Sequence, residues 1–111
     1  MHHDGMKLWL DDERPAPVGW TWVKTTDEAT AHLAAGGVAE ASLDHDLGAC
    51  DGCLSAGCSR CGCLCHRDGS WFVRWMAETN CWPRQKPVVH SANPVGAKYM
   101  RDVIDRYFEE R

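Results

Sequence analysis

The sequence predicts an α/β fold, in which a four-stranded parallel sheet forms the middle layer of a three-layer sandwich. Short apolar runs alternate along the chain with segments of helical periodicity, which is the pattern of strand–helix–strand units. Three of these runs lead into acidic, histidine or serine residues. The carboxyl ends of parallel strands are where such sheets bind ligands. With 111 residues the chain can bury one core, so we expect a flexible segment over residues 1–6 and a single domain over residues 7–111.

Four short strands are expected. The first, "KLWL", runs directly into "DDERPAP", whose carboxylates and prolines end a buried parallel strand. The second has an alternating pattern, and the third and fourth each carry a polar cluster toward their carboxyl end. The predicted strands are Lys7–Leu10, Thr21–Thr25, Glu40–Asp46 and Lys86–Asn93.

Three helices are expected between and after these strands. Thr25 and Glu28 have the spacing of a capping box, and a Gly-Gly pair closes the segment that they open. The segment Ser70–Glu78 places two aromatic residues and a methionine on one helical face. Asn93 suits the N-cap of the last helix, because Pro94 then occupies its first position.

The overall composition excludes some classes of protein. The net charge of −4 argues against a general DNA-binding protein, because phosphate binding needs a positive surface. No apolar run approaches the length of a membrane span, and the N-terminus lacks the apolar segment of a secretion signal. We therefore expect a cytoplasmic protein. His2 and His3 are either native or the remnant of an expression tag, and neither is given a function.

Residues 49–69 differ in composition from the rest of the chain, with six cysteines and little apolar surface to bury. We interpret them as an insertion between the third strand and its helix, since the helical pattern resumes at Ser70. Clustered cysteines in a reducing compartment bind metal more often than they form disulfides. Four thiolates close the coordination sphere of tetrahedral Zn²⁺, so a structural zinc site is expected. The candidate ligands are Cys50, Cys53, Cys58, Cys61, Cys63, Cys65 and His66.

Two ligand sets fit the cysteine spacing of the insertion. The first three cysteines belong to both, and the fourth ligand is either Cys61 or Cys63. Cys65 and His66 are then spare and would allow a two-metal cluster. Iron–sulfur ligation stays open as an alternative. Cys81 lies beyond the insertion, and we expect it to be a buried free thiol.

Polar side chains follow three of the four predicted strands. Because the carboxyl ends of parallel strands meet at one edge of the sheet, we expect these side chains to converge there. Adjacent strands lie about 4.8 Å apart, so histidines from the third and fourth strands could reach one ligand. The converging residues are Asp11, Asp12, Asp44, His45, Asp46, His90 and Ser91.

These residues carry a resemblance to a known family. An acidic pair after the first strand, an Asp after the third and a Ser-Ala pair after the fourth resemble a response-regulator receiver domain, which has a flavodoxin-like fold. The motifs "WLDDERPAP", "SLDHDLG" and "VVHSANPVG" resemble more closely the cyclic-phosphate-processing receiver-like proteins. The resemblance implies that Asp11 and Asp12 help to hold magnesium, that Asp44 matches the phospho-accepting position, and that Ser91-Ala92 matches the hydroxyl-bearing pair.

The chain also departs from an ordinary receiver. The short segment "ERPAPVGW" stands where the first crossover helix is expected, and the sequence ends after the helix that follows the fourth strand. The fifth strand, with the lysine that contacts the phosphoryl group in ordinary receivers, is therefore expected to be missing. Conventional phosphorelay is the weaker hypothesis, and we expect a truncated receiver-like fold.

The resemblance implies chemistry by histidine on a cyclic phosphate. His45 and His90 could act as general base and general acid, since an imidazole exchanges a proton near neutral pH. Arg14 could hold the nonbridging oxygens, because guanidinium matches phosphate geometry. Ser91 could donate a hydrogen bond, and Asn93 is counted among the ligand-binding residues although capping alone would explain it.

The carboxylates Asp11, Asp12, Asp44 and Asp46 would repel an anionic ligand unless a positive charge intervenes. Mg²⁺, bound by one or two carboxylates and water, would supply it. Alternatively, Asp12 or Asp46 orients an imidazole through its second nitrogen. The sequence leaves both explanations open.

The leading hypothesis is hydrolysis or binding of a cyclic phosphate, such as a cyclic nucleotide or a 2′,3′-cyclic phosphate RNA end. The alternative is a noncatalytic receiver-like module, in signalling or protein interaction, with a structural zinc site and a protein partner. Trp20 and Trp22 flank the loop after the acidic pair, where one could stack on a nucleobase, although packing is the simpler interpretation.

Overall fold

The sheet is four-stranded and parallel, as the sequence predicts. The computed structural model describes residues 5–47 and 68–109, and the candidate zinc ligands, at positions 50–66, lie outside them. Every pair of neighbouring strands is parallel, in the order β2-β1-β3-β4. The strands are β1 (Met6–Leu10), β2 (Thr21–Val23), β3 (Val38–Leu43) and β4 (Val88–Val89).

The three predicted helices are present, and each begins at a side chain that caps it. They are α1 (Thr26–Ala35), α3 (Gly69–Thr79) and α4 (Pro94–Phe108). The capping box of Thr25 and Glu28 forms at the start of α1, as predicted. Asp68 caps α3 and Asn93 caps α4, in each case by accepting a hydrogen bond from a backbone N–H of the first turn.

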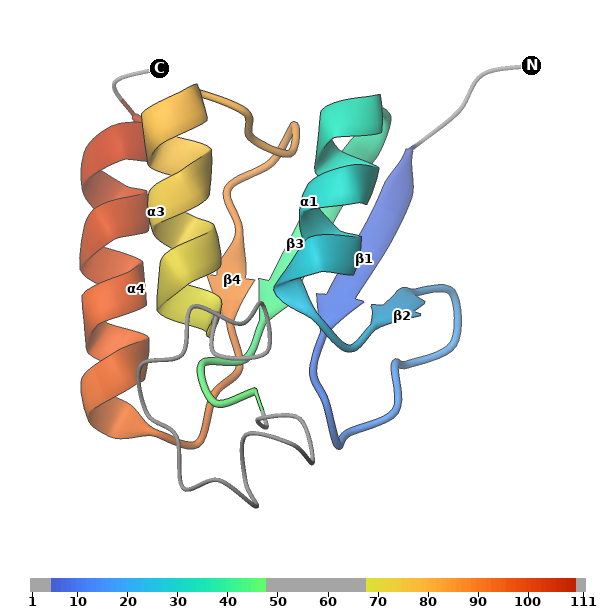
Figure 1. Ribbon diagram of the computed structural model, residues 1–111, viewed down its shortest axis with the longest axis horizontal. Helices are drawn as coiled ribbons and strands as arrows, with labels where there is room; N and C mark the ends of the chain where they lie inside the picture. Colours follow the sequence, from blue (N-terminus) through green and yellow to red (C-terminus); the bar gives the residue numbers. More distant parts are fainter. Residues whose placement is uncertain (1–4, 48–67, 110–111) are drawn as a thin grey trace, which may run out of the picture.

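All three helices cover one face of the sheet, which corrects the predicted three layers to two for the described residues. The connections from β2 to β3 and from β3 to β4 cross the sheet in the same direction, and right-handed crossovers put both helices on the same face. Helix α3 contacts both α1 and α4 (Figure 1). The connection from β1 to β2 crosses in the opposite direction, but residues 11–20 contain Pro15 and Pro17 and form no helix.

The two faces of the sheet differ in burial. On the helix-covered face, β1 contributes Leu8 and Leu10, which are fully buried. The alternate residues Lys7 and Trp9 point to the helix-free face and are exposed and half-buried, respectively. The main core consists of Leu8, Leu10, Val23, Ala29, Leu33, Val38, Ala41, Leu43, Phe72, Val73, Met76, Met100, Ile104 and Phe108.

Several strand boundaries differ from the predictions. β1 begins one residue early, at Met6, which the sequence had assigned to the flexible N-terminal segment. β2 ends at Val23, because Thr25 is needed to cap α1. β3 begins at Val38 instead of Glu40, immediately after the two glycines that end α1.

The polar clusters lie just beyond the strands. β3 ends at Leu43, so its polar cluster is outside the strand, and β4 is reduced to Val88–Val89. Backbone pairing nevertheless continues for one residue. Asp44 N donates to Leu10 O at 2.9 Å, and His90 N donates to Leu43 O at 2.9 Å. The ladder therefore fixes the backbone of both polar residues at the carboxyl edge of the sheet.

The residue that follows Asp68 lies beside the end of β3. Gly69 N donates to His45 O at 2.9 Å. A Cβ at Gly69 would overlap the backbone carbonyl of Asp44. Only glycine lets the two backbones approach this closely. The start of α3 is therefore held next to the polar cluster of β3.

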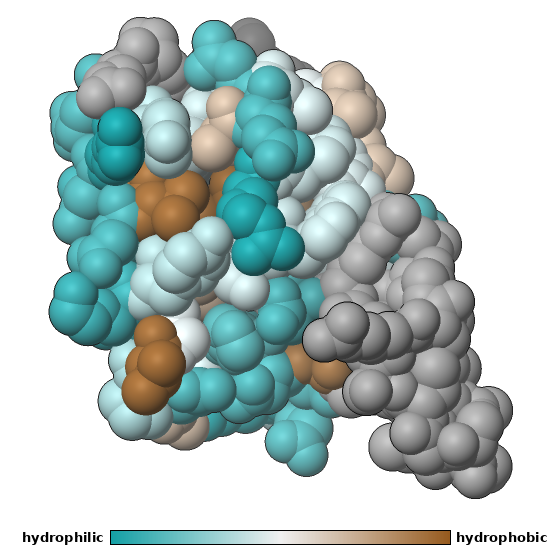
Figure 2. Space-filling view, turned by 60° about the vertical axis from the view of Figure 1, so that its left-hand side comes forward, coloured by the Kyte–Doolittle hydropathy of each residue, from teal (hydrophilic) through white to brown (hydrophobic). Residues whose placement is uncertain are grey.

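Within the described residues, no helix has the length and apolar character needed to cross a membrane. The side of the molecule that carries α4 presents hydrophilic side chains with smaller apolar patches between them (Figure 2).

The close backbone approach at Gly69 predicts a stability effect. In Gly69→Ala, the new methyl group meets the Asp44 carbonyl, and the backbone must shift. We expect the free energy of unfolding to fall by about 1–3 kcal/mol, measured by urea denaturation. The exposed substitution Arg74→Ala on the same helix should change it by less than about 0.5 kcal/mol. Equal stability of Gly69→Ala and the wild type would contradict the close approach.

Candidate functional site at the carboxyl edge of the sheet

Asp11 is a buried carboxylate that follows β1 directly, with 1% of its surface exposed. Its Oδ1 accepts backbone hydrogen bonds from Glu13 N at 2.8 Å and Arg14 N at 2.7 Å. Its Oδ2 lies 3.0 Å from His90 Nε2. Burial opposes ionisation, but the two backbone N–H groups and His90 outweigh it and lower the pKa of Asp11. Asp11 is therefore a carboxylate at neutral pH.

His90 is held by three groups from two strands. Its Nε2 faces Asp11 Oδ2, its Nδ1 lies 2.7 Å from Ser42 Oγ, and its ring stacks on Trp9 with centroids 3.9 Å apart and planes inclined by 4°. Because an ionised carboxylate only accepts hydrogen bonds, we assign the proton to Nε2. In the neutral imidazole, Nδ1 then accepts the hydrogen bond of the Ser42 hydroxyl. Both nitrogens of His90 are thus engaged within the protein.

Arg14 is anchored at the end of β4. Its Nη1 donates to His90 O at 3.0 Å, and its own carbonyl accepts a hydrogen bond from Trp9 Nε1 at 2.9 Å. The loop after β1 therefore folds back over the carboxyl edge and carries a guanidinium to it. A guanidinium has five N–H donors, so one bond to His90 leaves others for a ligand.

His45 forms a second network on the other side of the edge. Its Nδ1 lies 2.7 Å from Asp46 Oδ1, and its Nε2 lies 3.6 Å from Asp68 Oδ2. Asn93 Nδ2 donates to Asp46 Oδ1 at 3.3 Å. The hydrogen bond from His45 lowers the pKa of Asp46. Partial burial raises this pKa, but the hydrogen bond from Asn93 lowers it further, and the net change is downward. With the proton on Nδ1, the Nε2 atom of His45 carries the lone pair.

The start of α4 supports the His45 ring. A Cβ at Gly96 would lie 2.5 Å from His45 Cγ, so the imidazole occupies the space that a side chain would take. The Asn93 side chain joins the two, since its Oδ1 accepts from Gly96 N at 3.0 Å while its amide holds Asp46. Asn93 N in turn donates to Ser91 Oγ at 3.1 Å. Asn93 and Ser91 thus order the loop that holds the histidine.

The carboxylates of Asp11, Asp12 and Asp44 lie together, whereas Asp46 is outside this cluster and pairs with His45. Each offers a carboxylate oxygen, and the three oxygens lie within 4.8 Å of one another. Carboxylate oxygens are the ligands that Mg²⁺ prefers, and the ion needs only one or two of them beside water and phosphate. Asp11 already accepts three hydrogen bonds, and Asp44 Oδ1 accepts one from His45 N at 2.8 Å. The donor set fits Mg²⁺, which would neutralise the carboxylates beside an anionic ligand.

The predicted site residues of the described chain all lie at or next to this edge, but they fall into two networks. Within the described residues no hydrogen bond joins His45 to His90. Three side chains that contact the histidines were not among the predicted site residues: Ser42, Trp9 and Asp68. Asp68 could have been identified as an N-cap, because Asp favours that position and Asp68 precedes the predicted helix. Ser42 and Trp9 are ordinary strand residues in sequence.

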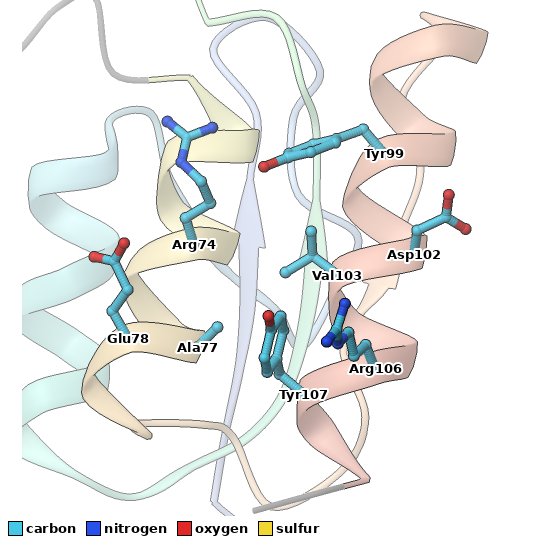
Figure 3. Close-up of a pocket in the computed structure, with 8 residues that line it drawn as sticks. All are labelled: Arg74, Ala77, Glu78, Tyr99, Asp102, Val103, Arg106 and Tyr107. Carbon is cyan, nitrogen blue, oxygen red and sulfur yellow. The ribbon is translucent and has the colours of Figure 1, made fainter.

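A groove of about 510 Å³ lies elsewhere, between α3 and α4. Figure 3 shows Tyr99 and Tyr107 of α4 facing Arg74 of α3 across an apolar floor that includes Val103. It contains no histidine and none of the clustered carboxylates at the strand ends. The titratable networks at the carboxyl edge are therefore the better candidate for chemistry.

Asp11 should make stability depend on pH. Its pKa is lower in the folded than in the unfolded state, so its contribution is present above the unfolded pKa and is lost as the pH falls below about 4. Asp11→Asn should lower the free energy of unfolding at pH 7 by about 1–3 kcal/mol, because an amide NH2 replaces the oxygen that accepts from His90 and the backbone N–H groups lose a charged acceptor. It should also flatten the acid-induced loss of stability.

The control is Glu13→Gln, which removes one exposed carboxylate from the same loop. Urea denaturation between pH 7 and pH 3, without added Mg²⁺, measures both variants. Parallel pH profiles for the wild type and Asp11→Asn would contradict the role given to this carboxylate.

The comparisons with known proteins agree with this architecture. A family model described as the cyclic-phosphate processing receiver domain matches residues 6–106, which is most of the chain. Neither the curated proteins nor the solved structures gave a match. The matched region contains every described residue of the carboxyl-edge site. By its sequence match and its parallel four-stranded fold, the chain belongs to the family of cyclic-phosphate processing receiver domains.

Proposed function

We propose that the carboxyl edge of the sheet binds a cyclic phosphate ester and hydrolyses it. The observation that carries the proposal is that both histidines at this edge have a carboxylate partner, His45 with Asp46 and His90 with Asp11. A carboxylate on one imidazole nitrogen fixes which nitrogen carries the proton, and so prepares the ring for acid–base work. The family description supports a cyclic phosphate as the ligand.

His45 is the proposed general base. Its Nδ1–H is held by Asp46, so Nε2 is the basic atom. The separation of 3.6 Å between Nε2 and Asp68 Oδ2 is too long for a hydrogen bond, so the Nε2 lone pair has no hydrogen-bond donor among the described residues. In the reaction, the water oxygen bonds to phosphorus while Nε2 of His45 takes the water proton.

His90 is the proposed general acid. In its imidazolium form, His90 carries a proton on each nitrogen, with Asp11 and Ser42 as the partners. The ring P–O bond breaks, and the leaving oxygen takes the Nε2 proton, which leaves His90 as a neutral imidazole. The product is a phosphate monoester with a free hydroxyl group. Proton exchange with solvent then returns His45 to its neutral form and His90 to its protonated form. A positioned acid or base contributes roughly 10²–10⁴-fold to a rate.

Arg14 and the acidic cluster are proposed to balance charge. The anchored guanidinium of Arg14 would bind nonbridging phosphate oxygens. Carboxylates of the cluster formed by Asp11, Asp12 and Asp44 would hold Mg²⁺, which would supply positive charge that offsets them. Zinc binding by the cysteine insertion and a cytoplasmic location remain predictions from the sequence.

A noncatalytic role is the second candidate, and one observation favours it. Both ring nitrogens of His90 are occupied, by Ser42 and Asp11, so a ligand must displace one contact before this histidine can act. A module that binds a cyclic phosphate or a protein partner without turnover would need no such displacement.

Replacement of either histidine tests the proposed reaction. His45→Ala and His90→Ala should each lower turnover of cyclic nucleotides and of 2′,3′-cyclic phosphate RNA ends by roughly 10²–10⁴-fold. His32→Ala, on α1 away from the edge, is the matched control and should keep the activity. Turnover by the wild type that survives both substitutions would refute the histidine assignment, and binding without turnover would establish the second candidate.

Magnesium should stabilise the fold through the acidic cluster. An ion that binds only the folded state adds about 1.4 kcal/mol when present at roughly ten times its Kd. Millimolar Mg²⁺ should therefore raise the Tm of the wild type but not that of the double variant Asp12→Asn, Asp44→Asn. Asp102→Asn, an exposed carboxylate on α4, should respond like the wild type. Equal shifts in all three proteins would place the ion elsewhere.

A further inference from the structure

Trp22 stands apart from the other five tryptophans. All six lie in the described residues, and Trp22 is the most exposed of them, at 36%. It lies on the edge strand β2 (Figure 1), where Val23 points into the core and Trp22 points to the helix-free face. By contrast, Trp9 packs between Trp20 and His90. Contacts with neighbouring rings therefore account for Trp9, whereas Trp22 has the most exposed ring.

The Trp22 ring is fixed beside the carboxyl-edge site. Its Nε1 donates to Asp11 O at 2.6 Å, and the carboxylate of the same residue holds His90. The indole thus contacts the backbone of one residue of the acidic cluster, and that same residue contacts the proposed general acid. A ring that is already oriented loses little conformational freedom when a ligand stacks on it.

One positive side chain lies at the ring, and another lies farther along the carboxyl edge. Lys24 Nζ lies 4.4 Å from the Trp22 ring centroid, and the guanidinium of Arg14 is anchored beyond β1 and β3, at the end of β4. An anionic ligand with a planar group matches this combination of cations and an exposed indole. Stacking of a base on an aromatic ring is stronger than an exposed cation–π contact, so a base can displace the flexible Lys24 side chain.

We infer that Trp22 is a stacking platform for a nucleobase, and that the ligand of this edge is a nucleoside cyclic phosphate, not a cyclic phosphate of a polyol. The inference rests on the proposed function, which supplies the cyclic phosphate. What it adds is that this phosphate is carried by a nucleoside. A polyol offers the same cyclic phosphate to Arg14 and the histidines but nothing planar to Trp22.

Two ligands with the same five-membered phosphate ring separate the two claims. Adenosine 2′,3′-cyclic monophosphate carries a base, and glycerol 1,2-cyclic phosphate does not. Calorimetry gives the Kd of each, and a turnover assay gives kcat and KM. The wild type should bind the adenosine ligand roughly 5- to 100-fold more tightly, which is the range for one stacked base.

Three variants identify the source of that preference. Trp22→Leu removes the aromatic face and should abolish the preference for adenosine, with binding of the glycerol ligand unchanged. Trp22→Phe loses the N–H but keeps an aromatic face, and should retain most of the preference. Tyr107→Leu, at an exposed aromatic residue on α4, should behave like the wild type. Circular dichroism confirms that each variant is folded.

The outcomes are distinguishable. Equal affinity of the wild type for the two ligands, or a preference that survives in Trp22→Leu, overturns the inference while turnover of both ligands still upholds the proposed function. Adenosine-selective binding without turnover upholds Trp22 as the platform and overturns the hydrolase. Binding of neither ligand overturns both claims.

Discussion

The buried carboxylate of Asp11 is the interaction on which the carboxyl edge depends. Its side chain closes the turn after β1 through two backbone N–H groups and holds His90 after β4, while its carbonyl accepts the indole N–H of Trp22 from β2. One residue thus ties three strand ends together. Since a buried charge without partners is unstable, these hydrogen bonds are also what lets the carboxylate exist there.

Much of the fold could be predicted from the sequence because local rules and tertiary structure agree. Residues close together in the sequence specify several elements. Examples are the capping box at Thr25, the cap at Asn93 and the short apolar runs of the strands. The prediction of a third layer was wrong, because it assumed the usual alternation of strands and helices along the whole chain. The connection with Pro15 and Pro17 contains no helix, and handedness then places the remaining helices together.

The candidate site was predictable in outline and not in detail. Parallel topology alone brings the strand-end residues to one edge, so Asp11, Asp44 and His90 could be grouped without coordinates. Which group each histidine contacts could not be predicted, because Ser42 and Asp68 reach them through side-chain packing. Nothing in the spacing of Ser42 and His90 along the chain, 48 residues apart, indicates their hydrogen bond.

The two histidine networks also give the site a physical asymmetry. His90 is enclosed by Trp9, Ser42 and Asp11, whereas His45 rests on the backbone of α4 with one loosely contacted nitrogen. Acid–base catalysis needs one group that accepts a proton while another donates. Unequal environments are how proteins separate these two roles.

Addition of water to a cyclic phosphate is the reaction proposed for this edge. Phosphorus-31 NMR of a five-membered cyclic phosphate, incubated with the protein in ¹⁸O-labelled water, tests it most directly. The cyclic resonance should be replaced by that of a phosphate monoester, with one ¹⁸O atom on phosphorus. An unchanged cyclic resonance, or a monoester without the label, would contradict it.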